Sequence, residues 1–302
     1  MLGQLFGRQA KKATKKEVNK KIYIPIRFSV LLKSKNWAIS RTDNFEEYKA
    51  KLFGEDRMEA KFHLFEKLVL PNLSKIVSNA GCVGVNVIII TSESLPKTFK
   101  EKLEDLISNL TFVSCVFASE TDDLLSVIDE EINKDVVTSD TDVSFATVRL
   151  DDDDLLAHNF VDKVEKYLSI SFTDHIVSFS RGYESFVNLS EKKLSPHMKL
   201  SSPKIALGLT HINYYVKSES KYLGTIGSVY GAGDHTMVHE NFTLIVDQSK
   251  AMYLRMSYYE QDTQAKGIFG RIERRDGAVV TTDEVTCHFP ELLNLFVNSR
   301  YK

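Results

Sequence analysis

The stretch that decides the fold reads Val143-Ser-Phe-Ala-Thr-Val-Arg-Leu150 and runs directly into Asp151-Asp-Asp-Asp154. Its apolar and β-branched residues are typical of a β-strand. On an extended chain successive side chains point to opposite sides, so Asp151 and Asp153 share one face while Asp152 and Asp154 share the other. Two carboxylates on one side, at the carboxyl end of a strand, can bind a divalent cation through oxygen ligands.

The same four acids have a second interpretation. An amphipathic helical pattern begins directly behind them, with apolar residues at Leu156, Phe160, Val164 and Tyr167. This is the helical period, and aspartate is favoured as the cap of a helix and near its positive N-terminal end. The four acids therefore form either a cation site or a helix cap. Without a cation or a basic partner, their mutual repulsion would raise at least one pKa.

Upstream of the aspartates, strand-like runs alternate with helical patterns. Strands are expected at 22–32, 83–90, 110–117 and 143–150, and helices at 57–77, 96–106 and 121–134. Pro71 should kink or restart the first of these helices. The alternation predicts parallel βαβ units. In open sheets of this kind ligands bind beyond the carboxyl ends of the strands, and the four aspartates follow such an end.

After residue 169 the sequence changes to short β-like runs broken by Gly, Pro and polar turns. The runs are 175–179, 186–189, 205–216, 243–246 and 251–259, and a terminal helix is expected at 283–298. No linker rich in Pro, Gly or Ser separates the two parts. We therefore expect one composite domain, with an α/β half at 22–168 and a mixed α+β half at 169–302.

Composition places the chain among soluble globular proteins. It has 302 residues, 43% of them hydrophobic and 26% charged, and a formal net charge of −2. That charge argues against nucleic acid as a partner, because phosphate backbones require a basic surface. No apolar run approaches the roughly 18 residues of a membrane span, and there is no secretory signal. Three isolated cysteines suit a reducing compartment, so we expect a cytoplasmic protein.

Residues 1–21 differ from the rest of the chain, because they hold seven basic side chains and one acidic side chain. We interpret them as a solvated, disordered tail. The alternative is a weak tether to anionic lipid, in which each basic residue near the surface contributes about 1 kcal/mol. In that case the protein would be peripheral to the inner face of the membrane.

Common nucleotide and hydrolase motifs are absent from the sequence. There is no GxxxxGK[ST] phosphate loop, no dinucleotide-binding glycine pattern after the first strand, no HExxH and no GxSxG. His235 and His239 stand four residues apart and would share one face of a helix. What remains is an acidic site for a hard metal beside a parallel sheet.

At this point the sequence resembles known families. A strand followed by Leu-Asp-x-Asp-Asp resembles the DxD signature of GT-A-type glycosyltransferases. More narrowly, Arg149-Leu-Asp-Asp-Asp-Asp-Leu-Leu156 resembles the RLDDDD segment of the bacterial family named putative rhamnosyltransferases. Three upstream blocks resemble that family in the same order. They are Arg27-Phe-Ser29, Phe62-His-Leu-Phe-Glu66 with Leu70-Pro71, and Thr91-Ser-Glu-Ser-Leu-Pro96.

The resemblance implies a GT-A-like, Rossmann-like fold with a mostly parallel sheet flanked by helices and a mixed β-rich C-terminal extension. It implies a glycosyltransferase that uses Mn²⁺ or Mg²⁺ to move a sugar, by the family name rhamnose, from a nucleotide-diphosphate sugar to a hydroxyl of a glycan or lipid-linked glycan. The setting would be synthesis of bacterial surface polysaccharide. Residues 22–168 would bind the donor, and residues 169–302 would face the acceptor.

The resemblance also assigns roles to the metal site. Asp151 would lie toward the ribose or a metal-bound water, and Asp153 would contact the metal directly. The family has a Val-His-x-Asn stretch in its second half, and Val238-His-Glu-Asn241 is similar. His239 is therefore the expected third ligand. Its alternative is a structural histidine without a ligand role.

Other residues are candidates by their chemistry. An inverting transferase needs a carboxylate that takes the proton of the acceptor hydroxyl; Asp234 is the first candidate, with an N-cap as its alternative, and Glu240 is the second. Arg27 and Arg255 are candidates for the nucleotide phosphates, because a guanidinium matches phosphate geometry. Their alternatives are a surface ion pair for Arg27 and a buried pair with an aspartate for Arg255.

Two other function classes stay open from the sequence. Phosphoryl or nucleotidyl transfer also uses paired carboxylates, with two metals about 4 Å apart. It would require a second acidic cluster, for which Asp140 and Asp142 are the near candidates. A cation-dependent glycan-binding module would bind metal and sugar without turnover.

Overall fold

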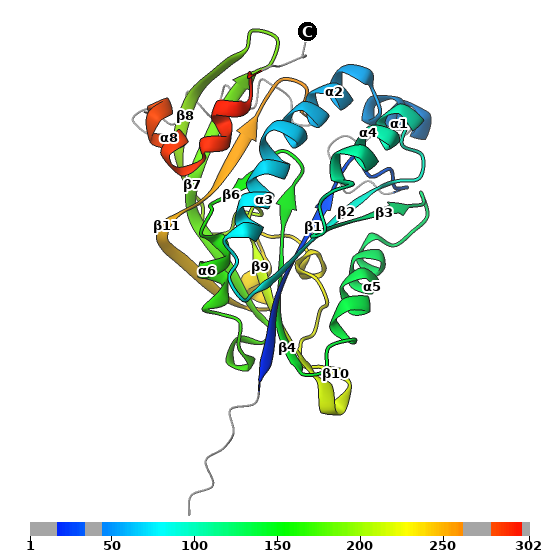
Figure 1. Cartoon of the computed structure of the whole chain (residues 1–302), viewed down its shortest axis with the longest axis vertical. Coiled ribbons are helices and arrows are strands. Elements are labelled where there is room, and N and C mark those ends of the chain that lie inside the picture. Colours follow the sequence, from blue (N-terminus) through cyan, green and yellow to red (C-terminus); the bar gives the residue numbers. More distant parts are fainter. Residues whose placement is uncertain (1–16, 34–43, 262–278, 298–302) are drawn as a thin grey trace, which may run out of the picture.

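A mixed sheet of twelve strands organises the part of the chain that the computed structural model describes, residues 17–33, 44–261 and 279–297. Its main order is β12-β8-β7-β9-β4-β1-β2-β3, seen nearly edge-on in Figure 1. β3, β2, β1 and β4 are parallel, and β9 is antiparallel to β4. The longer strands are β1 (Val18–Arg27), β2 (Gly84–Ser92), β3 (Val113–Ala118), β4 (Asp142–Val148), β7 (His175–Asn188), β8 (Lys193–Ser201), β9 (Thr210–Val216) and β11 (Thr243–Ser257). The two-residue strands are β5 (Leu150–Asp151), β6 (Leu155–Leu156), β10 (Lys221–Tyr222) and β12 (Val279–Val280).

Helices connect and cover the parallel strands. The α-helices are α1 (Phe45–Leu52), α2 (Glu55–Leu64), α3 (Leu70–Ser78), α4 (Lys97–Ile107), α5 (Leu124–Val136), α6 (Phe160–Glu165) and α8 (Thr282–His288). A π-helical segment, η1 (Phe65–Val69), joins α2 to α3. The 3-10 turns are η2 (Ile170–Phe172), η3 (Lys217–Glu219), η4 (Val229–Ala232), η5 (Val238–Glu240) and η6 (Pro290–Asn294). The expected class, an α/β fold with a mostly parallel core and a β-rich extension, is confirmed.

Alternating side chains build a core on each face of the parallel strands. On β1, Ile22 and Ile24 belong to a cluster that α2, α3 and α4 cover, whereas Tyr23 belongs to the opposite cluster, which α5 covers. β2 follows the same rule, because Ile89 joins the first cluster and Ile90 the second. A strand buried on both faces reads as a continuous apolar run, which is why the β2 region was predictable.

β1 begins at Val18 rather than at residue 22 and ends at Arg27 rather than at residue 32. The last four residues of the expected basic tail therefore belong to the sheet, where Lys20 bonds Glu165 and Lys21 bonds Asp135, 2.9 and 2.8 Å apart. The carboxylates of Glu165 and Asp135 thus form ion pairs with these two lysines. Residues 1–16, on which the proposed membrane tether depends, lie outside the described residues.

The helix expected directly behind the aspartates starts later. Leu155 and Leu156 first pair with Leu254 and Tyr253 of β11 as the short strand β6. α6 then begins at Phe160 with Asn159 at its N-cap. The aspartates are therefore not the cap of this helix. The helical period of 156–167 predicted the buried face correctly. It did not predict where the helix begins, because Leu155 and Leu156 pair with β11 as a strand.

The other boundary differences have local causes. Pro71 lies in the first turn of α3, where a proline is tolerated, and the π-helical segment precedes it. The expected terminal helix is divided into α8 and η6 at Pro290. β7 and β11 are each one long strand, where two separate runs were predicted. β11 has irregular register between Asp247 and Tyr253, which interrupts its sequence pattern.

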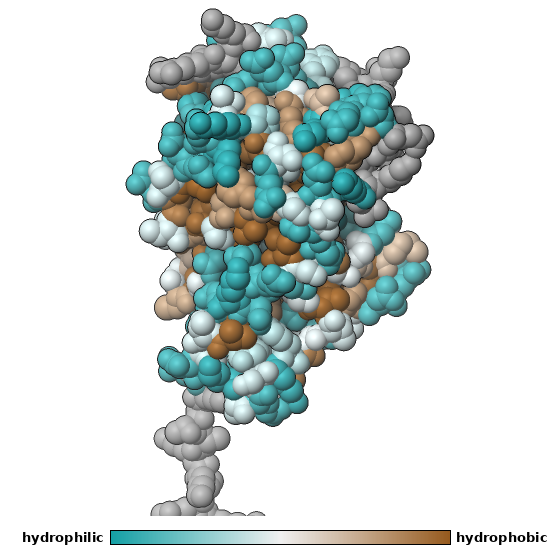
Figure 2. Space-filling view, turned by 90° about the vertical axis from the view of Figure 1, so that its right-hand side faces the viewer, coloured by the Kyte–Doolittle hydropathy of each residue, from teal (hydrophilic) through white to brown (hydrophobic). Residues whose placement is uncertain are grey.

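The sheet ends at β3, and all its residues except Ala118 are at least partly exposed. Figure 2 views the molecule from the side on which β3 lies in Figure 1, and shows apolar surface across the middle of this side with hydrophilic surface above and below. Within the described ranges, no helix combines the length and apolar character that crossing a bilayer requires.

Candidate functional site

A cavity of about 380 Å³ opens at the carboxyl ends of the parallel strands. This volume lies in the range of small-molecule sites, and the position is the one where open α/β sheets bind ligands. Segments from both halves of the chain form its wall. The described residues that line it are Arg27, Ser29, Val30, Tyr48, Leu52, Arg57, Lys61, Asp151, Asp152, Asp153, Asp154, Ile205, Ala206, Leu207, His235, Arg255, Met256, Tyr258 and Gln261.

All four aspartates line this cavity, and their exposure alternates as predicted. Asp152 and Asp154 are 3% and 7% exposed, whereas Asp151 and Asp153 are only partly buried. The chain is still extended at Asp151, the last residue of β5, and it turns at Asp152 and Asp153. The strand pairing of β5 with β1 thus delivers the carboxylates to the end of the sheet.

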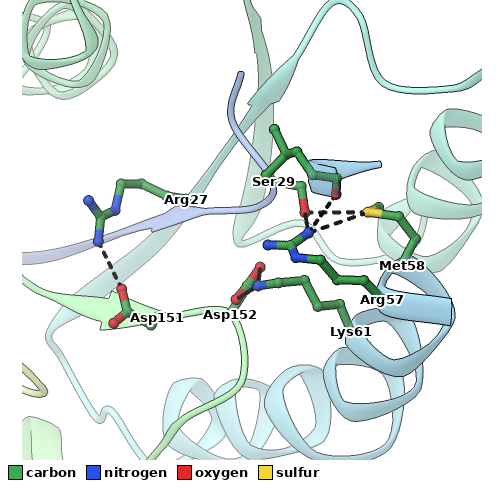
Figure 3. Close-up of polar contacts among 8 residues, drawn as sticks. Arg27, Ser29, Arg57, Met58, Lys61, Asp151 and Asp152 are labelled. Atoms are coloured by element: carbon green, nitrogen blue, oxygen red, sulfur yellow. Dashed lines mark hydrogen bonds and ion pairs between the residues drawn. The ribbon is translucent and has the colours of Figure 1, made fainter. Parts of the chain in front are cut away.

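Asp151 is held by an arginine of the neighbouring strand. Nη2 of Arg27 lies 3.1 Å from Oδ1 of Asp151 (Figure 3), and the guanidinium of Arg27 stacks on the ring of Tyr230 at 4.9 Å. Burial alone would raise the pKa of Asp151, but Arg27 and Arg149 outweigh it and lower this pKa below its usual value. Asp151 is therefore a carboxylate, and Arg27 is charged.

Asp152 is bound to a lysine from α2. Nζ of Lys61 lies 2.5 and 2.6 Å from the two carboxylate oxygens of Asp152, and Figure 3 shows the lysine reaching across from the helix. Both side chains are almost fully buried in the cavity wall. Asp152 is thus neutralised by a fixed partner.

Asp153 and Asp154 have weaker compensation. The backbone N–H of Met256 donates to Oδ1 of Asp154 at 2.9 Å. Burial raises the pKa of Asp153, and the charges of Asp152 and Asp151 raise it further, against the effect of Lys61. Burial and the neighbouring carboxylates also raise the pKa of Asp154. The hydroxyl of Tyr258 is buried close to this pair and has no hydrogen-bond partner of good geometry among the described residues.

The carboxyl groups of Asp151 to Asp154 are the oxygen donors in this cavity that could hold a divalent cation. A carboxyl group whose pKa is raised by neighbouring carboxylates has too little positive charge close to it. A bound cation would supply that charge, and hard oxygen donors suit Mg²⁺ and Mn²⁺. However, no three His, Cys, Asp or Glu side chains converge as a metal site within the described part of the chain. Mg²⁺ commonly uses one or two carboxylates together with substrate phosphates and water. Asp151 and Asp153, the two that are partly exposed, fit that arrangement.

The structure does not bring His239 to the aspartates. Val238 is buried in the short turn η5, so the adjacent His239 lies on the exposed side and contacts the ammonium of Lys204 at 3.0 Å. His235 lines the cavity instead, and its Nδ1 lies 2.5 Å from the carbonyl oxygen of Lys204. The four-residue spacing would place the two histidines on one face only if the segment were helical, and the described segment contains only the 3-10 turn η5.

The two predicted bases also lie outside the cavity wall. Asp234 is exposed, and its Oδ1 accepts hydrogen bonds from N and Oγ1 of Thr236, both at 2.9 Å. These bonds lower the pKa of Asp234. They close a local turn, whereas the N-cap residue of the nearby turn η5 is Met237. Asp234 precedes His235, a lining residue, and so lies near the rim. Glu240 is exposed in η5.

Arg255 lines the cavity. Its partner on the protein side is Glu184, whose Oε1 lies 4.0 Å from Nε of Arg255. Glu184 is buried on the adjacent strand β7 and also accepts a hydrogen bond from Ser257 at 2.9 Å. The charge of Arg255 also acts on an aspartate, because it lowers the pKa of Asp154 against the effect of burial.

Arg57 and Lys61 were not predicted as site residues. Nη1 of Arg57 donates to the carbonyl of Leu52 at 2.7 Å and to Oγ of Ser29 at 3.1 Å, which fixes the guanidinium at the cavity (Figure 3). The two basic residues are four positions apart on α2, beside the buried stripe of that helix. A basic pair at helical spacing next to an apolar stripe was the available signal.

Among the described residues, the structure does not bring the candidates for a second acidic cluster, Asp140 and Asp142, to this site. Asp142 lies at the start of β4, at the opposite end of that strand from the aspartates. Its carboxylate accepts hydrogen bonds from N of Lys217 at 3.0 Å and from the hydroxyl of Tyr214 at 3.2 Å. Asp140 is exposed at the same end.

Comparison with known proteins gives one match over most of the chain. A family model described as "Putative rhamnosyl transferase" matches residues 21–269. This range includes most of β1, the aspartates and the whole cavity wall described above. Among curated proteins no match is found.

Solved structures of low identity align with much of the chain. TarS 1–349 from S. aureus is 11% identical with a TM-score of 0.32, covering 94% of this chain and 73% of that one. A protein titled putative glucose-1-phosphate thymidylyltransferase from Bacillus anthracis is 12% identical with a TM-score of 0.34, covering 86% and 96%. A protein titled putative nucleotide-diphospho-sugar transferase from Desulfovibrio desulfuricans G20 is 10% identical with a TM-score of 0.33, covering 86% and 90%.

Proposed function

The chain belongs to the putative rhamnosyl transferase family and is a glycosyltransferase, and we propose that it is metal-dependent and uses a nucleotide-diphosphate sugar. The donor would bind in the cavity at the end of the parallel strands. The sugar would pass to a hydroxyl of a glycan or lipid-linked glycan. Rhamnose is the sugar that the family name suggests.

One observation carries the proposal: the cavity combines cavity-facing carboxylates with several fixed basic side chains. Arg27, Arg57 and Arg255 line it beside Asp151 and Asp153. Guanidinium groups match phosphate oxygens in geometry and charge. Asp151 and Asp153 would hold Mn²⁺ or Mg²⁺, which supplies neutralisation of the departing diphosphate. A cavity that binds only an uncharged glycan would not require so many basic side chains.

The remaining roles follow from what each side chain can do. Arg27, fixed by Asp151 and Tyr230, would orient a diphosphate oxygen without moving. Arg57, anchored to the carbonyl of Leu52, would approach from the α2 side. Fixed donors of this kind stabilise charge that develops on a leaving group, because they need no reorganisation when the bond breaks.

The acceptor side depends on a base. Asp234 near the rim is our first candidate and Glu240 the second. Asp234→Asn should lower kcat and leave the Kd of a nucleotide diphosphate unchanged, because a base acts on the acceptor hydroxyl. Full activity of both Asp234→Asn and Glu240→Gln would remove these residues from the mechanism.

The test is a thermal-unfolding panel of nucleotide diphosphates with and without Mn²⁺, followed by turnover of nucleotide-diphosphate sugars, rhamnose donors included. A ligand stabilises the state that binds it, so nucleotide and Mn²⁺ together should raise Tm, and less so in Asp153→Asn. Release of the nucleotide diphosphate with transfer of the sugar supports the proposal. Metal-dependent binding of glycan without turnover of any donor would replace it with a glycan-binding module.

A further inference from the structure

The ion pair between Lys61 and Asp152 is unusual because it is almost fully buried in the wall of a ligand cavity. Its side chains are 8% and 4% exposed, and the lysine contacts both carboxylate oxygens, at 2.5 and 2.6 Å. Burying two charges costs about as much as their attraction returns, so such a pair is a poor device for stability. The pair lies in the cavity wall among three other carboxyl groups. It therefore affects the binding of charged ligands more than it affects the stability of the fold.

Lys61 places a fixed positive charge inside the carboxylate cluster. Arg27 adds a second positive charge at Asp151. Like charges a few ångströms apart repel each other, so the charges of Lys61 and Arg27 oppose the entry of a cation. Lys61 also occupies both oxygens of Asp152, which removes that carboxylate from the ligands available to a metal. The cluster therefore attracts a divalent cation less than four unpaired carboxylates would.

The basic side chains and the carboxyl groups along the described wall are equal in number. The wall carries four carboxyl groups, Asp151 to Asp154, and four basic side chains, Arg27, Arg57, Lys61 and Arg255. Arg255 is shared with Glu184 behind it. A divalent cation alone, or a diphosphate alone, would disturb this balance. Both together would nearly preserve it, because the negative diphosphate offsets the cation and faces the basic side chains.

We propose that Lys61 is a resident counter-ion that makes binding of a divalent cation conditional on the nucleotide diphosphate. The inference rests on the proposed function, since it concerns the same cavity. Lys61 is a positioning residue in this scheme. By linkage, a cation that needs the nucleotide must also raise the affinity for the nucleotide by the same factor.

The experiment is a calorimetric titration of Mn²⁺ into the full chain, without and with uridine or thymidine diphosphate as probes. For the wild type we expect weak binding of Mn²⁺ alone and at least tenfold tighter binding with the nucleotide that the protein accepts. Lys61→Gln keeps a hydrogen-bond donor for Asp152 but removes the charge. It should bind Mn²⁺ alone at least tenfold more tightly than the wild type, and the coupling to nucleotide should shrink.

Lys67→Gln is the matched control. Lys67 follows in the same helical run, lies outside the cavity wall and pairs with Glu66 at 2.9 Å, so its replacement should leave Mn²⁺ binding unchanged. Equal or weaker Mn²⁺ affinity of Lys61→Gln would overturn the proposal. If this variant fails to fold, Lys61→Met is the substitute, and equal Mn²⁺ affinity of the wild type with and without nucleotide overturns the proposal by itself.

This outcome is separable from that of the proposed function. The titration uses neither a donor sugar nor turnover, so a protein that transfers sugar but shows no effect of Lys61→Gln refutes the counter-ion role alone. Coupled Mn²⁺ and nucleotide binding without sugar transfer would instead refute the proposed function and leave the role of Lys61 intact.

Discussion

Nη2 of Arg27 lies 3.1 Å from Oδ1 of Asp151, and this pair joins two strand ends that are 124 residues apart in the chain. The same two residues are register partners in the pairing of β1 with β5. On its other side the guanidinium contacts the ring of Tyr230, whose hydroxyl donates to the carbonyl of Pro25 at 3.1 Å. Arg27 is therefore held in place before any ligand binds.

Arg27→Gln should weaken binding of a nucleotide diphosphate in the presence of Mn²⁺ by about tenfold or more, corresponding to about 1.4 kcal/mol. Glutamine keeps a donor but loses the charge and the fork geometry that match phosphate. Calorimetric Kd values for the wild type and the variant test this. Arg181→Gln, on the exposed side of β7, is the control, and an unchanged Kd for Arg27→Gln would exclude Arg27 from the phosphate site.

Asp153→Asn should lower kcat/KM by roughly a hundredfold or more, as is typical for loss of a group that stabilises charge in the transition state. The amide has nearly the same shape, so the cavity is preserved while the negative charge is lost. Turnover of a nucleotide-diphosphate sugar at several Mn²⁺ concentrations measures the effect. Asp140→Asn removes an exposed carboxylate at the other end of β4 and should be silent. Comparable activity of the two variants would contradict a metal role for Asp153.

The ring of Tyr230 lies between two guanidiniums, with Arg27 at 4.9 Å and Arg149 at 5.5 Å from its centroid. Cation–π contacts of this kind contribute about 0.5–2 kcal/mol each. Tyr230→Phe keeps the ring, so it should keep nucleotide affinity, whereas Tyr230→Leu should weaken it severalfold because Arg27 loses one of its supports. Equal Kd values for the two variants would show that the ring does not position Arg27.

The parts of this site that lie on one strand were predictable from the sequence. A β-branched run followed by Asp151 to Asp154 indicates both the end of a strand and the alternation of exposure, because both depend on neighbouring residues. The fold class was predictable for the same reason: each βαβ unit has its own apolar pattern. Arg27 was a candidate because of its guanidinium on the expected first strand, 22–32, and the structure places it at the end of β1.

Site residues on segments other than the strand that carries the aspartates could not be placed from the sequence pattern. Lys61 meets Asp152 across 91 residues, and only the packing of α2 on the sheet brings them together. His239 was preferred over His235 because of a sequence block, yet the backbone of η5 turns Val238 inward and leaves His239 outside. A three-residue 3-10 turn is too short to have a period that a sequence pattern can reveal, so the positions of the two histidines needed coordinates.

Gly182→Ala should destabilise the protein by about 1–3 kcal/mol or more, the usual cost of overpacking. A Cβ at Gly182 would lie 2.4 Å from the ring of Tyr253 and 2.5 Å from its carbonyl oxygen, where β11 crosses close to β7. Urea unfolding compared with Gly84→Ala is the measurement, since a Cβ at Gly84 meets its nearest neighbour at an ordinary 3.6 Å. An equal decrease in the free energy of unfolding of the two variants would mean that β7 and β11 can move apart enough to accommodate the added methyl group.

His211 should make the protein less stable as the pH falls. Its side chain is fully buried, and burial lowers the pKa of His211 to about 4, although Asp174 at 3.3 Å acts in the opposite direction. The unfolded chain binds this proton at pH values below about 6.5, whereas the folded chain binds it only near 4. Stability from this group is thus complete above about 6.5 and is lost as the pH falls toward 4, by about 3 kcal/mol in total.

Other groups also titrate in this range, so the contribution of His211 must be isolated by difference. His211→Gln cannot be protonated there, and it should be less stable than the wild type at pH 7.5, because a tightly packed imidazole is replaced. The gap in the free energy of unfolding should narrow steadily between pH 6.5 and 4.5, since only the wild type has a buried imidazole to protonate. Urea midpoints at pH 7.5, 6.5, 5.5 and 4.5 measure it. A gap that stays constant with pH would show that His211 has a nearly normal pKa in the folded protein.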